Sequence, residues 1–84
     1  MAKVVIYTTP FCPYCVAAKR LLSSKSVDFE EIDVSRNPQL RVEMMQKSGR
    51  HTVPQVFIDG VSVGGSDDIH ALDREGRLDS LLAA

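Results

Sequence analysis

The sequence has little net charge, no long apolar run and few cysteines, and each absence narrows the class of protein. Ten basic and 11 acidic residues give a formal charge of -1, and the basic residues are scattered along the chain, so no surface is expected to attract nucleic acid. No apolar stretch approaches the ~20 residues that a membrane-spanning helix needs, and the first residues show no signal-peptide pattern. We therefore expect a cytoplasmic protein without nucleic-acid or membrane partners.

The 84-residue chain has two cysteines, Cys12 and Cys15, and two histidines, His51 and His70. A tetrahedral zinc site needs four ligands, and the chain has neither a second Cys-X-X-Cys pair nor a paired histidine spacing. No resident metal is therefore expected, and in a reducing compartment the pair indicates a working dithiol rather than a structural staple. With 44% hydrophobic residues, the length suits one monomeric domain over residues 1–84.

The two cysteines lie between an apolar run, residues 4–7, and a segment with apolar residues at helical spacing. Pro13 suits the first position of a helix, where its missing N–H costs no hydrogen bond, so Cys12 is expected at the helix N-terminus. Unpaired backbone N–H groups and the helix dipole favour a thiolate there. We therefore interpret Cys12 as the nucleophile. Cys15, one turn further and closer to the core, is expected to stay protonated until it attacks a mixed disulfide on Cys12.

Hydrophobic periodicity predicts an α/β domain of order β-α-β-α-β-β-α, with a four-stranded mixed sheet between helices. Asp59 and Gly60, between two apolar runs, are a strong hairpin signal. Asn37 and Pro38 open a helix that Gly49 ends. Strands are expected over about 4–7, 27–34, 55–58 and 61–63, and helices over about 13–24, 38–48 and 66–75, followed by a short C-terminal segment that packs down.

Three details of this pattern are more specific. The apolar alternation of the second strand slips at Glu30 and Glu31, which predicts that the strand ends or bulges there. The buried face of the second helix is expected to carry Leu40, Met44, Met45 and Ser48. Ser66 is expected to cap the third helix, whose first turn holds Asp67 beside a second aspartate.

Three motifs together resemble a glutaredoxin of the short, dithiol, bacterial-like type. They are residues 12–15 (CPYC), 52–54 (TVP) and 64–68 (GGSDD), in this order and with a hairpin between the last two. The resemblance covers nearly the whole chain. It implies the thioredoxin fold, no tightly bound cofactor, and glutathione as a co-substrate held by parts of all three motifs.

The resemblance also implies which residues bind each part of glutathione. The Val53–Pro54 peptide bond would be cis, and the backbone of Val53 would pair with the cysteinyl unit as an added strand does. Backbone N–H groups of Ser66 and Asp67, with the Asp67 carboxylate, would meet the charges of the γ-glutamyl end. The remaining residues expected to shape the groove are Tyr14, Thr52 and Pro54.

One cation of the family site is missing from this chain. The family usually has a lysine or arginine three residues before the first cysteine, where this chain has Thr9. Arg41 falls where the family commonly has a polar residue facing the glycyl carboxylate, and its guanidinium can bind a carboxylate through two hydrogen bonds. We expect Arg41 to compensate for Thr9.

The implied activity is glutathione-dependent thiol-disulfide exchange. Its partners would be glutathione and disulfide-containing or glutathionylated proteins, with ribonucleotide reductase as a family-level candidate. Two alternatives stay open. One is a redoxin of similar fold served by thioredoxin reductase, which Thr9 favours and residues 64–67 oppose. The other is an iron–sulfur carrier with a cluster bridging two chains, which Pro13 disfavours by stiffening the loop.

Overall fold

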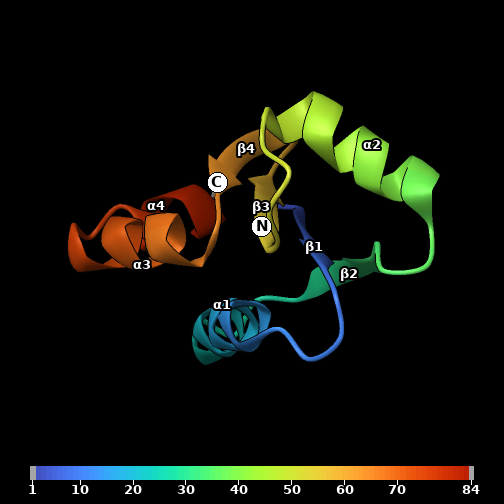
Figure 1. Ribbon diagram of the computed structural model, residues 1–84. Coiled ribbons are helices and arrows are strands. Elements are labelled where there is room, and N and C mark those ends of the chain that lie inside the picture. Colours follow the sequence, from blue (N-terminus) through green and yellow to red (C-terminus); the bar gives the residue numbers. More distant parts are fainter. Residues whose placement is uncertain (1, 84) are drawn as a thin grey trace.

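The computed structural model describes residues 2–83 and shows a mixed sheet between two layers of helices (Figure 1). The strand order is β2-β1-β3-β4, with β2 parallel to β1 and with β3 antiparallel to both β1 and β4. This arrangement confirms the predicted fold class and strand order along the chain. The strands are β1 (Val4–Thr8), β2 (Phe29–Asp33), β3 (Gln55–Ile58) and β4 (Val61–Gly64).

The helices divide between the two faces of the sheet, as Figure 1 shows in a view along its layers. Residues of α1, α3 and α4 pack against one face, and α2 packs against the other. The predicted C-terminal segment is itself a short helix. The helices are α1 (Pro13–Ser24), α2 (Pro38–Ser48), α3 (Ser66–Arg74) and α4 (Leu78–Ala83).

Local signals set the boundaries of α2. The Asn37 side chain accepts hydrogen bonds from the backbone N–H groups of Gln39 and Leu40, both at 3.1 Å, which satisfies two of the helix's unpaired donors. Pro38 is the first helical residue, and Gly49 ends the helix with a left-handed φ of 74°. Glycine adopts this φ without the strain that a side chain would cause. The predicted bounds of α2, residues 38–48, are confirmed.

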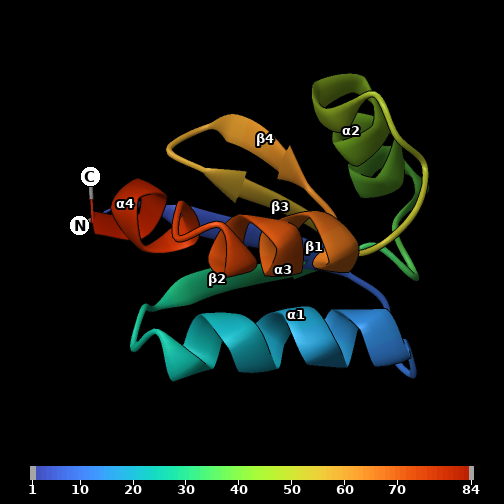
Figure 2. The ribbon, with the colours of Figure 1, turned by 90° about the vertical axis from the view of Figure 1, so that its left-hand side faces the viewer.

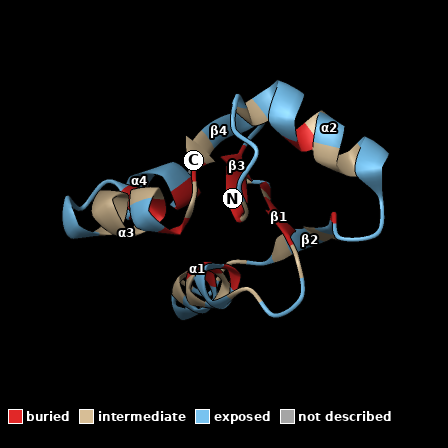
Figure 3. Ribbon diagram, in the orientation of Figure 1, coloured by how far each residue is buried: buried red, intermediate tan, exposed pale blue. Residues whose placement is uncertain are grey.

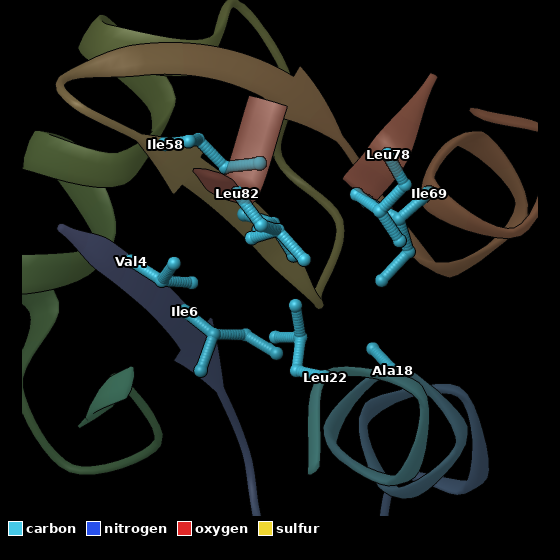
Figure 4. Close-up of a cluster of buried hydrophobic side chains, with 9 residues drawn as sticks. Val4, Ile6, Ala18, Leu22, Ile58, Ile69, Leu78 and Leu82 are labelled. Carbon is cyan, nitrogen blue, oxygen red and sulfur yellow. The ribbon is translucent and has the colours of Figure 1, made fainter. Parts of the chain in front are cut away.

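The larger core lies between the sheet, α1, α3 and α4 (Figure 4). In α4, Leu78 and Leu82 are buried, whereas Leu81 faces solvent. The short helix therefore closes the end of this core with one apolar face. The buried members of this core are Val4, Ile6, Ala18, Leu22, Val56, Ile58, Ile69, Leu78 and Leu82.

The smaller core lies beneath α2, which is largely exposed in Figure 3. Tyr7 and Phe57 meet edge to face there, with ring centroids 5.5 Å apart, and the Tyr7 hydroxyl donates to Glu43 at 2.8 Å. Burial and Glu43 raise the pKa of Tyr7 to about 12. Met44 is the buried methionine of α2, so the expectation that Met45 faces inward was wrong. With 3.6 residues per turn, adjacent residues cannot share one narrow face.

The expected irregularity at Glu30 and Glu31 was also wrong, because β2 pairs with β1 one residue to one over its whole length. The strand lies at the edge of the sheet, so its charged side chains can reach solvent on either face. Phe29 packs on the larger core and Ile32 on the smaller one. Because this edge strand contributes one apolar residue to each core, its apolar and polar residues do not alternate regularly. In the sequence, this irregularity looks like a bulge. The register shift of this sheet lies instead between β3 and β4.

Candidate active site

Three segments that are distant in the sequence meet at one end of the sheet, on the right in Figure 2. They are the start of α1, the loop that leads into β3, and the start of α3. Together they form an open groove of about 280 Å³. The groove is lined by Tyr14, Arg50, Thr52, Val53, Pro54, Gly65, Ser66, Asp67 and Asp68.

Cys12 is the N-cap of α1, as predicted, and lies beside Val53 of the groove lining. Its sulfur accepts a hydrogen bond from the backbone N–H of Cys15 at 3.2 Å and lies 4.0 Å from the carbonyl oxygen of Val53. Both cysteines are free thiols, and Cys12 is half-buried. A hydrogen bond from a helix N-terminus favours an anion over a neutral group. The sulfur is thus accessible and faces a backbone donor.

Cys15 lies one turn into α1 and is 1% exposed. Burial, followed by the hydrogen bond to Cys12, raises the pKa of the Cys15 thiol well above its ordinary value. The backbone of Thr9 and the charge of Lys19 act in the opposite direction but are outweighed. Cys15 therefore stays protonated at neutral pH, as expected, and its backbone N–H bonds to the sulfur that its side chain would attack.

The loop before β3 brings its backbone to Cys12. The Val53–Pro54 peptide bond is cis, as the resemblance implied. The buried side chain of Gln55 donates to the carbonyl oxygen of Thr52 at 3.0 Å and lies 3.3 Å from its hydroxyl oxygen. Gln55 thus holds Thr52 in place. Sequence analysis missed this role, although a glutamine at the start of an otherwise apolar strand was a visible signal.

The start of α3 forms the opposite wall of the groove. Gly65, rather than Ser66, is the N-cap, so the predicted cap was one residue late. The Asp68 carboxylate accepts from the Gly65 N–H at 2.8 Å and from the Arg50 guanidinium at 2.7 Å. These two hydrogen bonds hold the pKa of Asp68 below its ordinary value. Gly65 has no side chain that could cap the helix. The Asp68 side chain in the first turn bonds to the Gly65 N–H instead, whereas the sequence predicted a cap by Ser66.

Ser66 and Asp67 occupy the first two positions of α3 and line the groove. Backbone N–H groups at the start of a helix have no partner within the helix, so these positions offer donors to an anion. The Ser66 carbonyl oxygen accepts from Nδ1 of His70 at 2.7 Å. That bond holds the first turn of α3 in place, and His70 is half-buried.

The two arginines near the groove differ in position. The Arg41 guanidinium donates to the carbonyl oxygen of His51 at 3.0 Å, and Arg41 is not part of the groove lining. Arg50 is part of it, and sequence analysis missed this residue. The available signal was its place two residues before Thr52, in the loop that leads into the TVP motif. The cation nearest the groove is therefore contributed by this loop.

Within residues 2–83, no three side chains of histidine, cysteine, aspartate or glutamate gather closely enough to hold a metal ion. None of the helices in this part of the chain combines the length and the apolar character needed to cross a membrane.

Comparisons with known proteins agree with this geometry. A family model described as Glutaredoxin matches residues 4–63. A glutaredoxin of Pseudomonas aeruginosa is 56% identical over 84 residues, which is 100% of both chains. Glutaredoxin 3 of Escherichia coli K12 is 56% identical over 82 residues, covering 98% of this chain and 99% of that protein. The crystal structure of a buckwheat glutaredoxin–glutathione complex matches with a TM-score of 0.90 at 27% identity, over 98% of this chain and 77% of the buckwheat chain.

The sheet order, the helix layers and the dithiol at the start of α1 define a redox thiol oxidoreductase with the thioredoxin fold. The coverage and the sequence identity of the matches then define the family. The chain belongs to the glutaredoxin family, and the resemblance carried by its three motifs is confirmed.

Proposed function

We propose that this protein is a glutathione-dependent thiol-disulfide oxidoreductase that reduces protein disulfides and glutathione mixed disulfides. The observation that carries the proposal is the contrast within the dithiol. Cys12 is accessible beside the groove and accepts a backbone hydrogen bond, whereas Cys15 is buried and kept protonated by its surroundings. One sulfur is placed to attack, and the other to displace what becomes attached.

The exchange begins when the Cys12 thiolate attacks one sulfur of a protein disulfide and the other sulfur leaves as a thiolate. Cys15 loses its proton and attacks the Cys12 sulfur, which releases the second protein thiol and closes a Cys12–Cys15 disulfide. Two glutathione molecules then reduce this disulfide and leave as one glutathione disulfide. With a glutathionylated protein, Cys12 takes the glutathione and a second glutathione removes it, so Cys15 is not needed.

The groove suits glutathione at two of its three parts. The backbone of Val53 lies beside Cys12 and can pair with the cysteinyl unit, which would align its sulfur for attack. The unpaired donors of Ser66 and Asp67 suit the γ-glutamyl carboxylate, and the Asp67 carboxylate suits its ammonium. Thr52, Pro54 and Tyr14 would form the adjoining surface. The complex of the buckwheat relative with glutathione supports glutathione as the ligand.

For the glycyl carboxylate we propose both arginines. Arg50 already lines the groove, although its guanidinium binds Asp68. Arg41 would have to turn from the His51 carbonyl oxygen, and a carboxylate is the stronger acceptor. If either arginine binds glutathione, Arg41→Gln or Arg50→Gln raises the KM for glutathione severalfold with kcat nearly unchanged. An unchanged KM in one variant removes that arginine from the site.

The proposal is tested by following reduction of a small glutathione mixed disulfide with NADPH, glutathione and glutathione reductase. We expect Cys12→Ser to abolish the activity. We expect Cys15→Ser to retain it on the mixed disulfide but to lose reduction of a protein disulfide. Activity with thioredoxin reductase in place of glutathione would contradict the glutathione assignment.

We propose a monomer acting in the cytoplasm on protein disulfides, with ribonucleotide reductase as a candidate substrate. Gel filtration of anaerobically purified protein tests the monomer. A brown, dimeric sample would contradict it and favour an iron–sulfur carrier instead.

A further inference from the structure

Phe11 is the most exposed large apolar residue in the described part of the chain. It directly precedes Cys12, its relative exposure is 102%, and its backbone has a φ of 61°. A bulky side chain is rarely found in this left-handed region, because its Cβ lies too close to the backbone. An aromatic ring that packs on nothing within its own chain is thus held in solvent beside the reacting sulfur.

The segments around Cys12 differ in charge. Residues 4–18, which carry both Phe11 and Cys12, contain no charged side chain. The loop before β3 and the start of α3 contribute Arg50, Asp67 and Asp68 to the groove lining. Both ends of glutathione are charged, and they match that lining rather than an exposed phenyl ring. Phe11 is not part of the groove lining, so its ring is left without an occupant when glutathione fills the groove.

We propose that Phe11, together with exposed Tyr14 three residues further along the chain, is the docking surface for polypeptide disulfides that carry an apolar residue beside the reacting cysteine. This inference rests on the proposed oxidoreductase function and adds its protein-substrate preference. Tyr14 is 65% exposed, so it can contact both the groove and the partner.

Disulfide geometry supports a polypeptide as the occupant. In a mixed disulfide the Cα atom of the partner cysteine lies about 4.4–6.8 Å from that of Cys12, and the Cα of Phe11 is about 3.8 Å from Cys12 along the chain. A polypeptide continues on both sides of its cysteine, so its neighbouring residues must lie against the surface around Cys12. An apolar neighbour loses water-exposed surface on Phe11, whereas a polar one gains nothing there.

Phe11 takes no part in the exchange of bonds. The Cys12 thiolate forms the new S–S bond, the partner's other sulfur leaves with the electron pair of the broken bond, and glutathione supplies the electrons that restore the dithiol. Contact with Phe11 stabilises the encounter and the mixed disulfide. Its effect is therefore expected in kcat/KM for the partner, as a dependence on the residue beside the attacked cysteine.

The test uses two peptides, each with one intramolecular disulfide, that differ in a single residue beside the attacked cysteine, leucine in one and serine in the other. Bis(2-hydroxyethyl) disulfide serves as a small reference. For the unmodified protein we expect kcat/KM to be about tenfold higher for the leucine peptide, which corresponds to about 1.4 kcal/mol. Phe11→Ser should remove most of that preference, and Phe11→Leu should keep most of it. Thermal unfolding confirms that both variants fold.

Val61→Ser is the matched control. Val61 is 64% exposed and pairs with Ile58, which itself pairs with Val4 at the start of β1. It therefore lies at the opposite end of the sheet from Cys12, and its replacement should leave the peptide preference intact.

A leucine preference that survives Phe11→Ser would overturn the inference. So would a dimer of the unmodified protein that Phe11→Ser dissociates, because a second copy would then cover the ring. Failure of the unmodified protein to reduce the small reference with glutathione would contradict the proposed function itself. That result is distinct from normal reduction without a peptide preference, which contradicts only the role of Phe11.

Discussion

Cys12 and Cys15 are three residues apart, yet they occupy different environments. Cys12 lies at the helix terminus beside an open groove, and Cys15 lies in the core, where burial raises its pKa. Because the thiolate is the reactive form of cysteine, we expect these two chemically identical side chains to differ in reactivity. Asp68 shows the same dependence on surroundings, since the Gly65 N–H and Arg50 stabilise its charged form.

The difference between the thiols can be measured by alkylation. At pH 7, iodoacetamide should modify Cys12 at least roughly tenfold faster than Cys15 in the reduced, folded protein, since Cys12 is accessible, whereas Cys15 is buried and its pKa is raised. Mass spectrometry of tryptic peptides after short exposure gives the two rates. In urea the rates should become similar. Equal modification in the folded protein would contradict the assignment of Cys12 as the attacking sulfur.

Asp68 should make stability depend on pH. Its pKa is lowered in the folded protein, so below about pH 4 the unfolded chain takes up a proton that the folded protein does not. The contribution of Asp68 is therefore full at pH 7 and is lost as the pH falls through the lowered pKa. Asp68→Ala should reduce the free energy of unfolding by about 1 kcal/mol at pH 7, and by much less near pH 2.

Urea unfolding at both pH values measures the effect. Asp28→Ala, which removes an exposed carboxylate between α1 and β2, is the control and should change stability little at either pH. A loss in Asp68→Ala that is as large near pH 2 as at pH 7 would show that the carboxylate's charge does not matter.

At the scale of elements, the site depends on the junction between β4 and α3. Gly64 has a φ of 99°, and a Cβ at this position would lie 2.7 Å from the Cβ of Asp68. The chain can therefore turn from strand to helix, and the Asp68 carboxylate can reach the Gly65 N–H, only if position 64 has no side chain. The wall of the groove is set by this close approach.

Gly64→Ala should lower the free energy of unfolding by about 2–4 kcal/mol, because left-handed strain and steric overlap add. Gly76→Ala separates the two effects. Gly76 has a φ of 74°, but no atom lies within 4 Å of a Cβ placed there, so strain alone should cost about 1–2 kcal/mol. Chemical denaturation of both variants gives the comparison. Equal losses would contradict a steric role for Asp68.

At the scale of the whole molecule, the last helix joins elements from both halves of the chain. Lys25, at the end of α1, forms ion pairs with Asp73 of α3 and with Asp79 of α4, the latter at 3.0 Å. Leu78 and Leu82 fill the end of the larger core beneath these pairs. A domain of this size has a small core, so α4 contributes a large share of its stability.

Leu78→Ala should therefore lower the free energy of unfolding by about 2–5 kcal/mol, through lost burial and the cavity that remains. This is a large fraction of the roughly 5–15 kcal/mol typical of natural domains. Leu81→Ala, at a residue that is 37% exposed in the same helix, should change stability by no more than about 0.5 kcal/mol. Thermal or urea unfolding distinguishes the two. Similar losses would show that α4 is not anchored through Leu78.

Most of the fold followed from signals within a few residues of each other. Proline at the first helical position, Asn37 as a cap and the Asp59–Gly60 turn act through local backbone geometry, and the structure has each of them where the sequence predicts. Two of the failed predictions concerned the direction in which side chains point. Met45 and the alternation at Glu30 depend on how an element packs, which periodicity describes only approximately. The third placed the N-cap of α3 at Ser66, one residue late.

The sequence by itself determined the dithiol, its place at the start of a helix, and the three motifs of the family. Tertiary structure decided that Arg50 rather than Arg41 lines the groove, that Cys15 stays protonated, and that Phe11 projects into solvent beside Cys12. The physical reason is that burial, charge pairing and exposure depend on contacts between residues distant in the chain. Those contacts exist only once the sheet has brought the three segments together.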